Sequence, residues 1–168
     1  MKIVFDVEAL EGDVFRVILS SGDDAFFASE RFFEAKGIDV DIVEIDLERV
    51  KGENPATLSV LRSIADGIGR CFMHNQRAVL YYYCDDMNDV PSIGVRNQGM
   101  WPQEYRSQLF GLMFRRYVEQ NNLSEDIVDV SITIQQDARP LYMHLIARNK
   151  HVAYLEQLKE FIIENFGK

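Results

Sequence analysis

The longest uninterrupted apolar stretch of the sequence is Ala78–Cys84, seven residues that include three consecutive tyrosines. A membrane-spanning helix needs ~20 apolar residues, so this run is too short to cross a bilayer. A short, aromatic-rich apolar run is typical of a strand that other elements cover on both faces. The sequence therefore predicts a central strand at residues 78–84. Because ~100–200 residues is the usual size of a domain, we expect one domain over residues 1–168.

Periodic hydrophobic patterns surround this strand. Alternation of apolar and polar residues predicts strands, and apolar residues spaced by three and four predict helices. The expected strands are 2–8, 14–19, 38–47, 78–84, 128–135 and 140–148, and the expected helices are 24–36, 54–72, 102–118 and 150–165. The resulting order, ββαβαβαββα, indicates an α+β fold with helices packed on a mixed or largely antiparallel sheet.

Three local features refine this prediction. The alternation within Ile38–Leu47 changes phase, which suggests a bulge or an edge that becomes buried part-way along. Asn54 and Pro55 are suited to the N-cap and first position of the following helix. Gly67 and Gly69 are expected to weaken or end that helix.

The helix that begins at Pro102 carries a stripe of apolar residues at helical spacing. Such a stripe normally faces the core. The residues expected to line its buried side are Tyr105, Leu109, Leu112, Met113 and Val118.

The charge of the chain is uneven. The formal net charge is −9, and residues 1–50 hold 13 acidic against 5 basic residues, so they carry −8 of it. This balance argues against nucleic acid as a partner, because duplex binding depends on Lys and Arg neutralising phosphates. The acidic stretch is either a docking face for a basic partner or an ordinary solvated face that maintains solubility.

The sequence also bears on the compartment. Asp6 and Glu8 lie where a secretory signal would need its apolar segment, so no such signal is expected. Cys71 and Cys84 both have apolar neighbours, which suits buried free thiols. A cytoplasmic protein without a membrane anchor is therefore predicted.

The common catalytic motifs are missing from the sequence. It contains neither the Gly-x-Ser-x-Gly turn of an activated serine nor a Walker-type phosphate loop. His74, His144 and His151 are not at the spacing of metal ligands. Structural roles are therefore expected for the three histidines.

One group of acidic residues is retained as a candidate site. Asp85, Asp86 and Asp89 follow the central strand, and the next helix carries Glu104 and Arg106. Carboxylates at a strand end can hold Mg²⁺, and the group could then serve metal-dependent hydrolysis or phosphoryl transfer. The alternative is turn chemistry, in which such side chains bond nearby backbone amides.

Met100 and Trp101 precede the helix that begins at Pro102. If solvated, they would form an interaction site. They could equally fold back as an anchor over the core.

The segment Val79–Tyr117 resembles an uncharacterised family of small bacterial proteins, a domain of unknown function. In that family an aromatic strand ends in Tyr-x-Cys-Asp and precedes an arginine and a phenylalanine-containing amphipathic helix. The matching residues are Tyr82, Cys84, Asp85, Arg106, Phe110, Phe114 and Tyr117. The resemblance implies a bacterial cytoplasmic protein with no assigned activity.

Taken together, these features favour a small protein without catalytic activity that acts through protein–protein contacts. It would serve an accessory or regulatory role, with an unknown partner or as a homo-oligomer. The alternative is the Mg²⁺-dependent enzyme that uses the loop with Asp85, Asp86 and Asp89.

Overall fold

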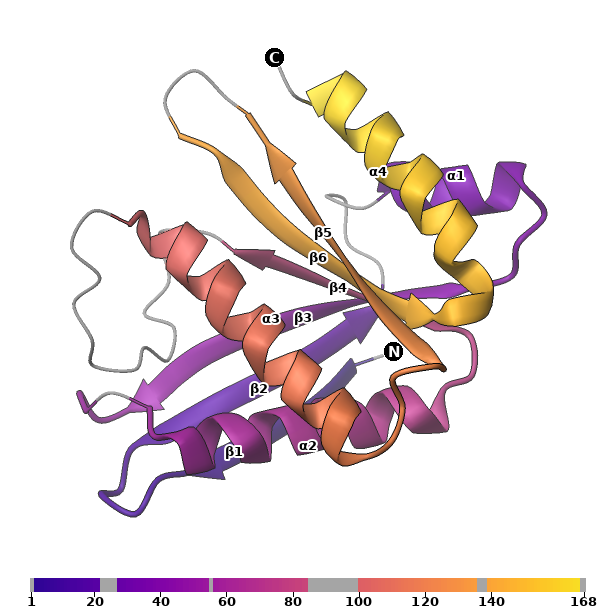
Figure 1. Ribbon diagram of the computed structural model, residues 1–168. Coiled ribbons are helices and arrows are strands. Elements are labelled where there is room, and N and C mark those ends of the chain that lie inside the picture. Colours follow the sequence, from indigo (N-terminus) through magenta and orange to yellow (C-terminus); the bar gives the residue numbers. More distant parts are fainter. Residues whose placement is uncertain (1, 22–26, 55, 85–99, 136–138, 167–168) are drawn as a thin grey trace.

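The computed structural model of the chain (Figure 1) describes residues 2–21, 27–54, 56–84, 100–135 and 139–166. The element order is the predicted ββαβαβαββα, with one short 3-10 helix, η2, added before the last helix. The strands are β1 (Lys2–Glu8), β2 (Val14–Ser21), β3 (Asp41–Lys51), β4 (Ala78–Cys84), β5 (Ile127–Ile134) and β6 (Leu141–Arg148). The helices are α1 (Phe27–Ala35), α2 (Leu58–His74), α3 (Pro102–Gln120), η2 (Asn149–His151) and α4 (Val152–Phe166).

The described strands form one six-stranded mixed sheet in the order β1-β2-β3-β4-β6-β5. Among them, β3 and β4 pair in parallel, and every other neighbouring pair is antiparallel. The apolar run at residues 78–84 is strand β4, which lies inside the sheet, and all its residues except half-buried Tyr83 are buried. The predicted α+β fold and its central strand are confirmed.

Helices cover the two faces of the sheet unequally. On one face, α2 packs on β1 and β2, and α3 packs on β4, β5 and β6. On the other face, α4 packs on β5 and β6 beside α1, which contacts β3. Each face has its own hydrophobic cluster, centred on residues such as Ile64 and Leu80 on the first face and Leu145 and Leu155 on the second.

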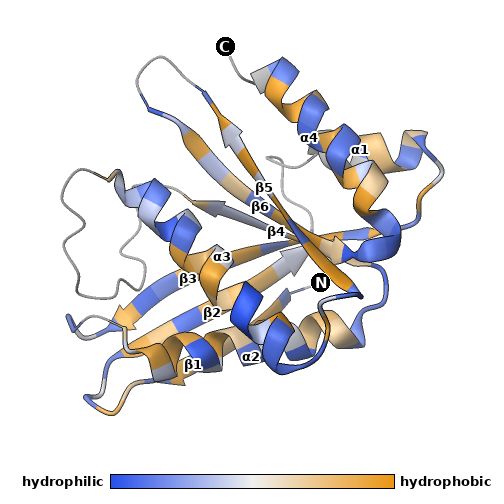
Figure 2. Ribbon diagram, in the orientation of Figure 1, coloured by the Kyte–Doolittle hydropathy of each residue, from blue (hydrophilic) through white to orange (hydrophobic). Residues whose placement is uncertain are grey.

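The phase change predicted in residues 38–47 has its origin in this unequal cover. Ile42 belongs to the cluster under α1 and α4, and its neighbours Val43 and Ile45 belong to the cluster under α2 and α3. The pairing of β3 is regular there, so a bulge at this point is wrong. Strand β3 is covered on both faces at its start and is apolar on one face further along, as Figure 2 shows by its alternating colours. The register instead shifts between Val14 and Phe15.

The start and the continuity of α2 differ from expectation. Thr57, not Asn54, is the N-cap residue, and its hydroxyl accepts a hydrogen bond from the backbone N–H of Val60 at 3.3 Å. Gly67 and Gly69 do not end the helix, which continues to His74.

Both glycines permit close packing of α2. A Cβ atom on Gly67 would lie 2.4 Å from the Phe5 ring of β1, and one on Gly69 would lie 2.1 Å from the Tyr117 ring of α3. A missing side chain therefore lets neighbouring aromatic rings rest on the helix backbone.

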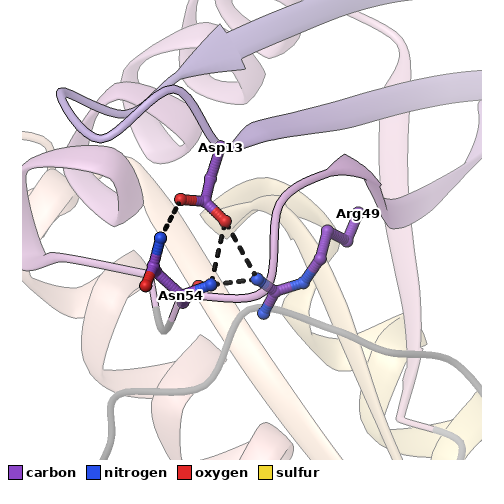
Figure 3. A network of polar contacts seen from close by, with 3 residues as sticks. All are labelled: Asp13, Arg49 and Asn54. Atoms are coloured by element: carbon purple, nitrogen blue, oxygen red, sulfur yellow. Dashed lines mark hydrogen bonds and ion pairs between the residues drawn. The ribbon is translucent and has the colours of Figure 1, made fainter.

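Asn54 instead joins a polar network at the end of the β2–β3 ribbon (Figure 3). The Asp13 carboxylate, on a residue that is 1% exposed, accepts from the Asn54 backbone N–H at 2.9 Å and from its side-chain amide at 2.8 Å. Arg49 lies 3.4 Å from the same carboxylate and donates to the Asn54 carbonyl oxygen at 2.6 Å. The hydrogen bond from the Asn54 side chain, followed by the backbone bond and the Arg49 charge, lowers the pKa of Asp13 despite the opposing effect of burial. The network joins the turn before β2 to the segment that leads into α2.

Candidate functional site

The inner face of α3 is more polar than its hydrophobic stripe suggests. Gln103 and Ser107 are buried there, one helical turn apart, in line with Phe110. Tyr105 is half-buried and Leu112 is exposed, so the predicted buried side is wrong for those two. Apolar periodicity missed the true inner face because two of its positions carry polar side chains.

These polar side chains meet a buried histidine. The Ser107 hydroxyl oxygen lies 2.9 Å from Nε2 of His144, and Nδ1 of His144 lies 2.9 Å from both carboxylate oxygens of Asp129. Ser107 is 9% exposed and His144 is 3% exposed. We call this chain of hydrogen bonds the Ser107–His144–Asp129 relay.

The sheet register brings the relay together. Asp129 on β5 pairs with Ile146 on β6, and His144 stands two residues before Ile146, so both side chains emerge on the face that α3 covers. Gly111 of α3 lies beside the imidazole, and a Cβ atom there would be 3.4 Å from Cε1 of His144, which is an ordinary van der Waals contact.

Aromatic rings enclose one side of the imidazole. The Phe110 ring lies 5.2 Å from the His144 ring and stacks on Tyr82 of β4 at 4.1 Å. Nearby on the same face of β6, burial followed by the charge of Glu104 raises the pKa of Tyr142. The imidazole therefore sits in a mainly apolar setting whose polar groups come from α3 and β5.

The relay has a defined proton arrangement. A carboxylate only accepts hydrogen bonds, so Asp129 requires a proton on Nδ1 of His144. In the neutral imidazole, Nε2 is then the acceptor for the Ser107 O–H. The arrangement can take up the serine proton, and it also fixes α3 to the β5–β6 hairpin.

The predicted metal site falls mostly outside the described residues. Asp85, Asp86 and Asp89 are among residues that the structure does not describe. Glu104 and Arg106 lie half-buried on α3. Within the described ranges, no group of three or more His, Cys, Asp or Glu side chains is placed to hold a metal ion.

The two residues proposed for interaction lie at the start of α3. Trp101 is the N-cap residue and is 46% exposed, and Met100 before it is half-buried. The guanidinium of Arg139, just before β6, lies 5.2 Å from the centre of the Trp101 ring. Trp101 is thus partly exposed to solvent and lies beside the Arg139 guanidinium.

A second feature is a sheet face that stays exposed. We define the open face as the outward residues of β1, β2 and β3 opposite α2: Lys2, Val4, Asp6, Glu8, Arg16, Ile18, Ser20, Glu44, Asp46 and Glu48. On this surface Val4 is 48% exposed, and the side chains of Asp6 and Glu48 are 40% and 50% exposed. In the described part of the chain, the helices on this face of the sheet are α1, which contacts β3, and α4, which contacts β5 and β6.

The charges of the open face follow its register. Arg16 on β2 forms an ion pair with Asp6 on the neighbouring strand β1 at 2.8 Å, and it lies 3.6 Å from Glu48 on β3. The hydrogen bond from Arg16 lowers the pKa of Asp6 and raises that of the guanidinium. The next row places Val4 beside Ile18 and Ile18 beside Asp46. With five carboxylates against two cations, the open face is acidic around an apolar centre.

The open face accounts for part of the acidic excess of the first 50 residues, whereas no motif or residue spacing in the sequence indicates the relay. Its members come from α3, β5 and β6, and Ser107 and His144 are 37 positions apart. His144 was expected to be structural, and it is buried. The sequence offers one indirect hint, because His144 interrupts the apolar residues of β6, and the neighbouring strand β5 has polar residues such as Asp129 at alternate positions.

Comparisons with known proteins give no relative: no family model, no curated protein and no solved structure matches this chain. The resemblance over Val79–Tyr117 therefore stays a prediction. Of the helices that the structure describes, none has the length and apolar character needed to cross a bilayer.

Proposed function

We propose that this protein acts through protein–protein contacts, with the open face as the docking surface for a basic partner. The observation that carries the proposal is the uneven cover of the sheet. Val4 stays 48% exposed in the middle of a strand, although α1 and α4 cover the same sheet face further along.

The chemistry of the open face suits a helix from a partner. In a layered α+β fold, a sheet face with apolar residues is normally covered by a helix. Val4 and Ile18 offer apolar contact, and the carboxylates of Asp46 and Glu48 lie beside them. A partner helix with apolar residues flanked by Lys and Arg would complement both properties.

Electrostatics supports a charged partner rather than a neutral one. Glu44 pairs with Tyr81 of the neighbouring strand β4, and burial followed by the charge of Glu44 raises the pKa of Tyr81. Complementary charge accelerates association and selects partners, and it weakens as salt screens the surface. An accessory or regulatory role follows from binding of this kind.

The first experiment compares two variants of equal charge. The double variant Asp46→Lys with Glu48→Lys alters the open face, and the control Glu156→Lys with Glu160→Lys alters exposed positions of α4. The probe is a fluorescent amphipathic helical peptide of leucine and lysine, measured by fluorescence anisotropy at low and high salt. We expect the affinity to fall at least tenfold in the open-face variant, which is about 1.4 kcal/mol, and to stay within twofold in the control. Equal losses in both variants would mean that the peptide responds to net charge alone, and the proposal would be wrong.

A second experiment locates natural partners. A photo-reactive phenylalanine analogue is placed at Val4, or at Leu112 on the exposed side of α3 as the control. Cross-linking in source-cell extract should give a salt-sensitive adduct with a basic protein from the Val4 position. If adducts form equally from Leu112, or persist unchanged in high salt, the open face is not the docking surface.

A further inference from the structure

We propose that Ser107 is a nucleophile activated by His144 and Asp129, and that the relay gives this protein an acyl-transfer activity on small carboxylic esters. This activity is separate from docking at the open face. The relay lies under α3, on the opposite side of the sheet from Val4 and Asp46.

The connectivity of the relay is the one that nucleophilic serine chemistry requires. The hydroxyl of Ser107 contacts Nε2, and the carboxylate contacts Nδ1, so the histidine is oriented by one neighbour and faces the other. Such a constellation is recognised by geometry and roles rather than by sequence position. Both contacts are 2.9 Å, within the hydrogen-bond range that proton transfer needs.

The reaction balances with groups on the chain and water. As the Ser107 oxygen bonds to the ester carbonyl carbon, its proton passes to Nε2 of His144 and the carbonyl electron pair moves onto oxygen. The electron pair on that oxygen then re-forms the carbonyl as the C–O bond to the leaving alcohol breaks, and the same proton goes to the alcohol oxygen, which leaves an acyl-serine. Water repeats the sequence on the acyl-serine, which releases the carboxylic acid and restores Ser107. Asp129 stays ionised and stabilises the imidazolium at each stage.

Gln103 supplies a second observation at the same place. Its side-chain amide donates to the Pro140 carbonyl oxygen at 3.4 Å, whereas its buried Oε1 has no hydrogen-bond partner within the part of the chain that the structure describes. Gln103 precedes Ser107 by four residues, so the two side chains share the inner face of α3. A buried acceptor without a partner is costly, and an ester that carries a hydroxyl or amide donor would satisfy it.

The alternative role of the relay is structural, with Ser107 serving only to fix α3 on the sheet. Both roles use the same hydrogen bonds, so stability measurements cannot separate them. Covalent reactivity can, because a serine that only packs does not attack electrophiles.

The test uses a fluorophosphonate probe on the full chain. An activated serine displaces fluoride from this probe and keeps the phosphonyl group, which mass spectrometry locates on a peptide. We expect Ser107 to be labelled in the wild-type protein, and the labelling rate to fall at least tenfold in Asp129→Asn and in His144→Gln.

Ser131 provides the matched control. It lies opposite His144 in the β5–β6 register and is exposed, and Ser131→Ala should leave the labelling unchanged. Wild-type protein that is folded by circular dichroism but unlabelled at Ser107 would overturn the proposal, whether or not the variants fold. Labelling of Ser107 that persists at the wild-type rate in Asp129→Asn and His144→Gln would overturn it as well.

Discussion

Substituting Gly67 by alanine sets two effects of known size against each other. Glycine in a helix interior costs about 0.8–1 kcal/mol relative to alanine, so helix propensity alone predicts that Gly67→Ala stabilises the protein. In the structure, the new Cβ atom would lie 2.4 and 2.5 Å from two atoms of the Phe5 ring. Since carbon atoms pack at ~3.5 Å or more, the ring would have to move by about 1 Å.

The packing effect should win. Overpacking of this kind costs ~1–3 kcal/mol, which exceeds the gain in propensity. The difference between the two effects predicts that Gly67→Ala lowers the free energy of unfolding by up to about 2 kcal/mol, or the melting temperature by up to ~8 °C. Urea unfolding followed by circular dichroism gives the free energy of unfolding, provided that its dependence on urea concentration is the same in both proteins. A thermal scan gives the melting temperature.

Two further variants check the reasoning. Gly111→Ala on α3 gains the same propensity, and its Cβ atom would lie at an ordinary 3.4 Å from His144, so this variant should be more stable than wild type. In a Phe5→Leu background the ring edge is gone, and Gly67→Ala should become neutral or stabilising. If Gly67→Ala raises stability in the wild-type background, or if Phe5→Leu leaves its effect unchanged, the close contact between α2 and β1 does not decide the outcome.

Three other perturbations have defined outcomes. Because hydrogen bonds lower the pKa of Asp13 below 3.8, the ionised carboxylate stabilises the fold above that pH, and the stabilisation is lost as pH falls through the lowered pKa. The difference in free energy of unfolding between wild type and Asp13→Asn, measured by urea titration, should therefore shrink from pH 6 to pH 2. A constant difference over this range would contradict the network. Thr57→Ala removes the N-cap of α2 and should cost about 1 kcal/mol, whereas Asn54→Ala should act through the Asp13 network and not through the cap, which helix-selective hydrogen exchange can distinguish. In the native protein a thiol reagent should modify half-buried Cys71 faster than Cys84, which is 1% exposed. Equal reaction rates of the two thiols without denaturant would contradict the burial of Cys84.

The sequence predicted elements better than it predicted contacts between them. The apolar run of β4 and the alternation of β5 are local patterns, and both gave the correct strand. Asn54 has good N-cap chemistry, but tertiary hydrogen bonds from its amide to Asp13 place it elsewhere, and Thr57 caps the helix. Local propensity cannot register a competing partner 41 residues away.

The glycines and the relay show the same limit. Gly67 was expected to weaken α2, and the Phe5 ring that makes the glycine useful lies on another strand. Ser107 and Asp129 are ordinary surface-type residues until the register of β5 and β6 sets them around His144. Chemistry assembled from three elements leaves no spacing that a single sequence can reveal.

The parallel pairing of β3 with β4 has a consequence for the order of folding. It spans only Asp41–Glu44 on β3, whereas the antiparallel pairs on either side extend along most of their strands. The β1–β2 hairpin in one half of the sheet and the β5–β6 hairpin in the other pair residues that are at most 21 positions apart, whereas every β3–β4 pair joins residues 37 positions apart, with α2 between them. The two halves should thus form early and join late, so that in pulsed hydrogen exchange the amides of Asp41–Glu44 gain protection after those of β2. Simultaneous protection would indicate that the junction itself nucleates the chain.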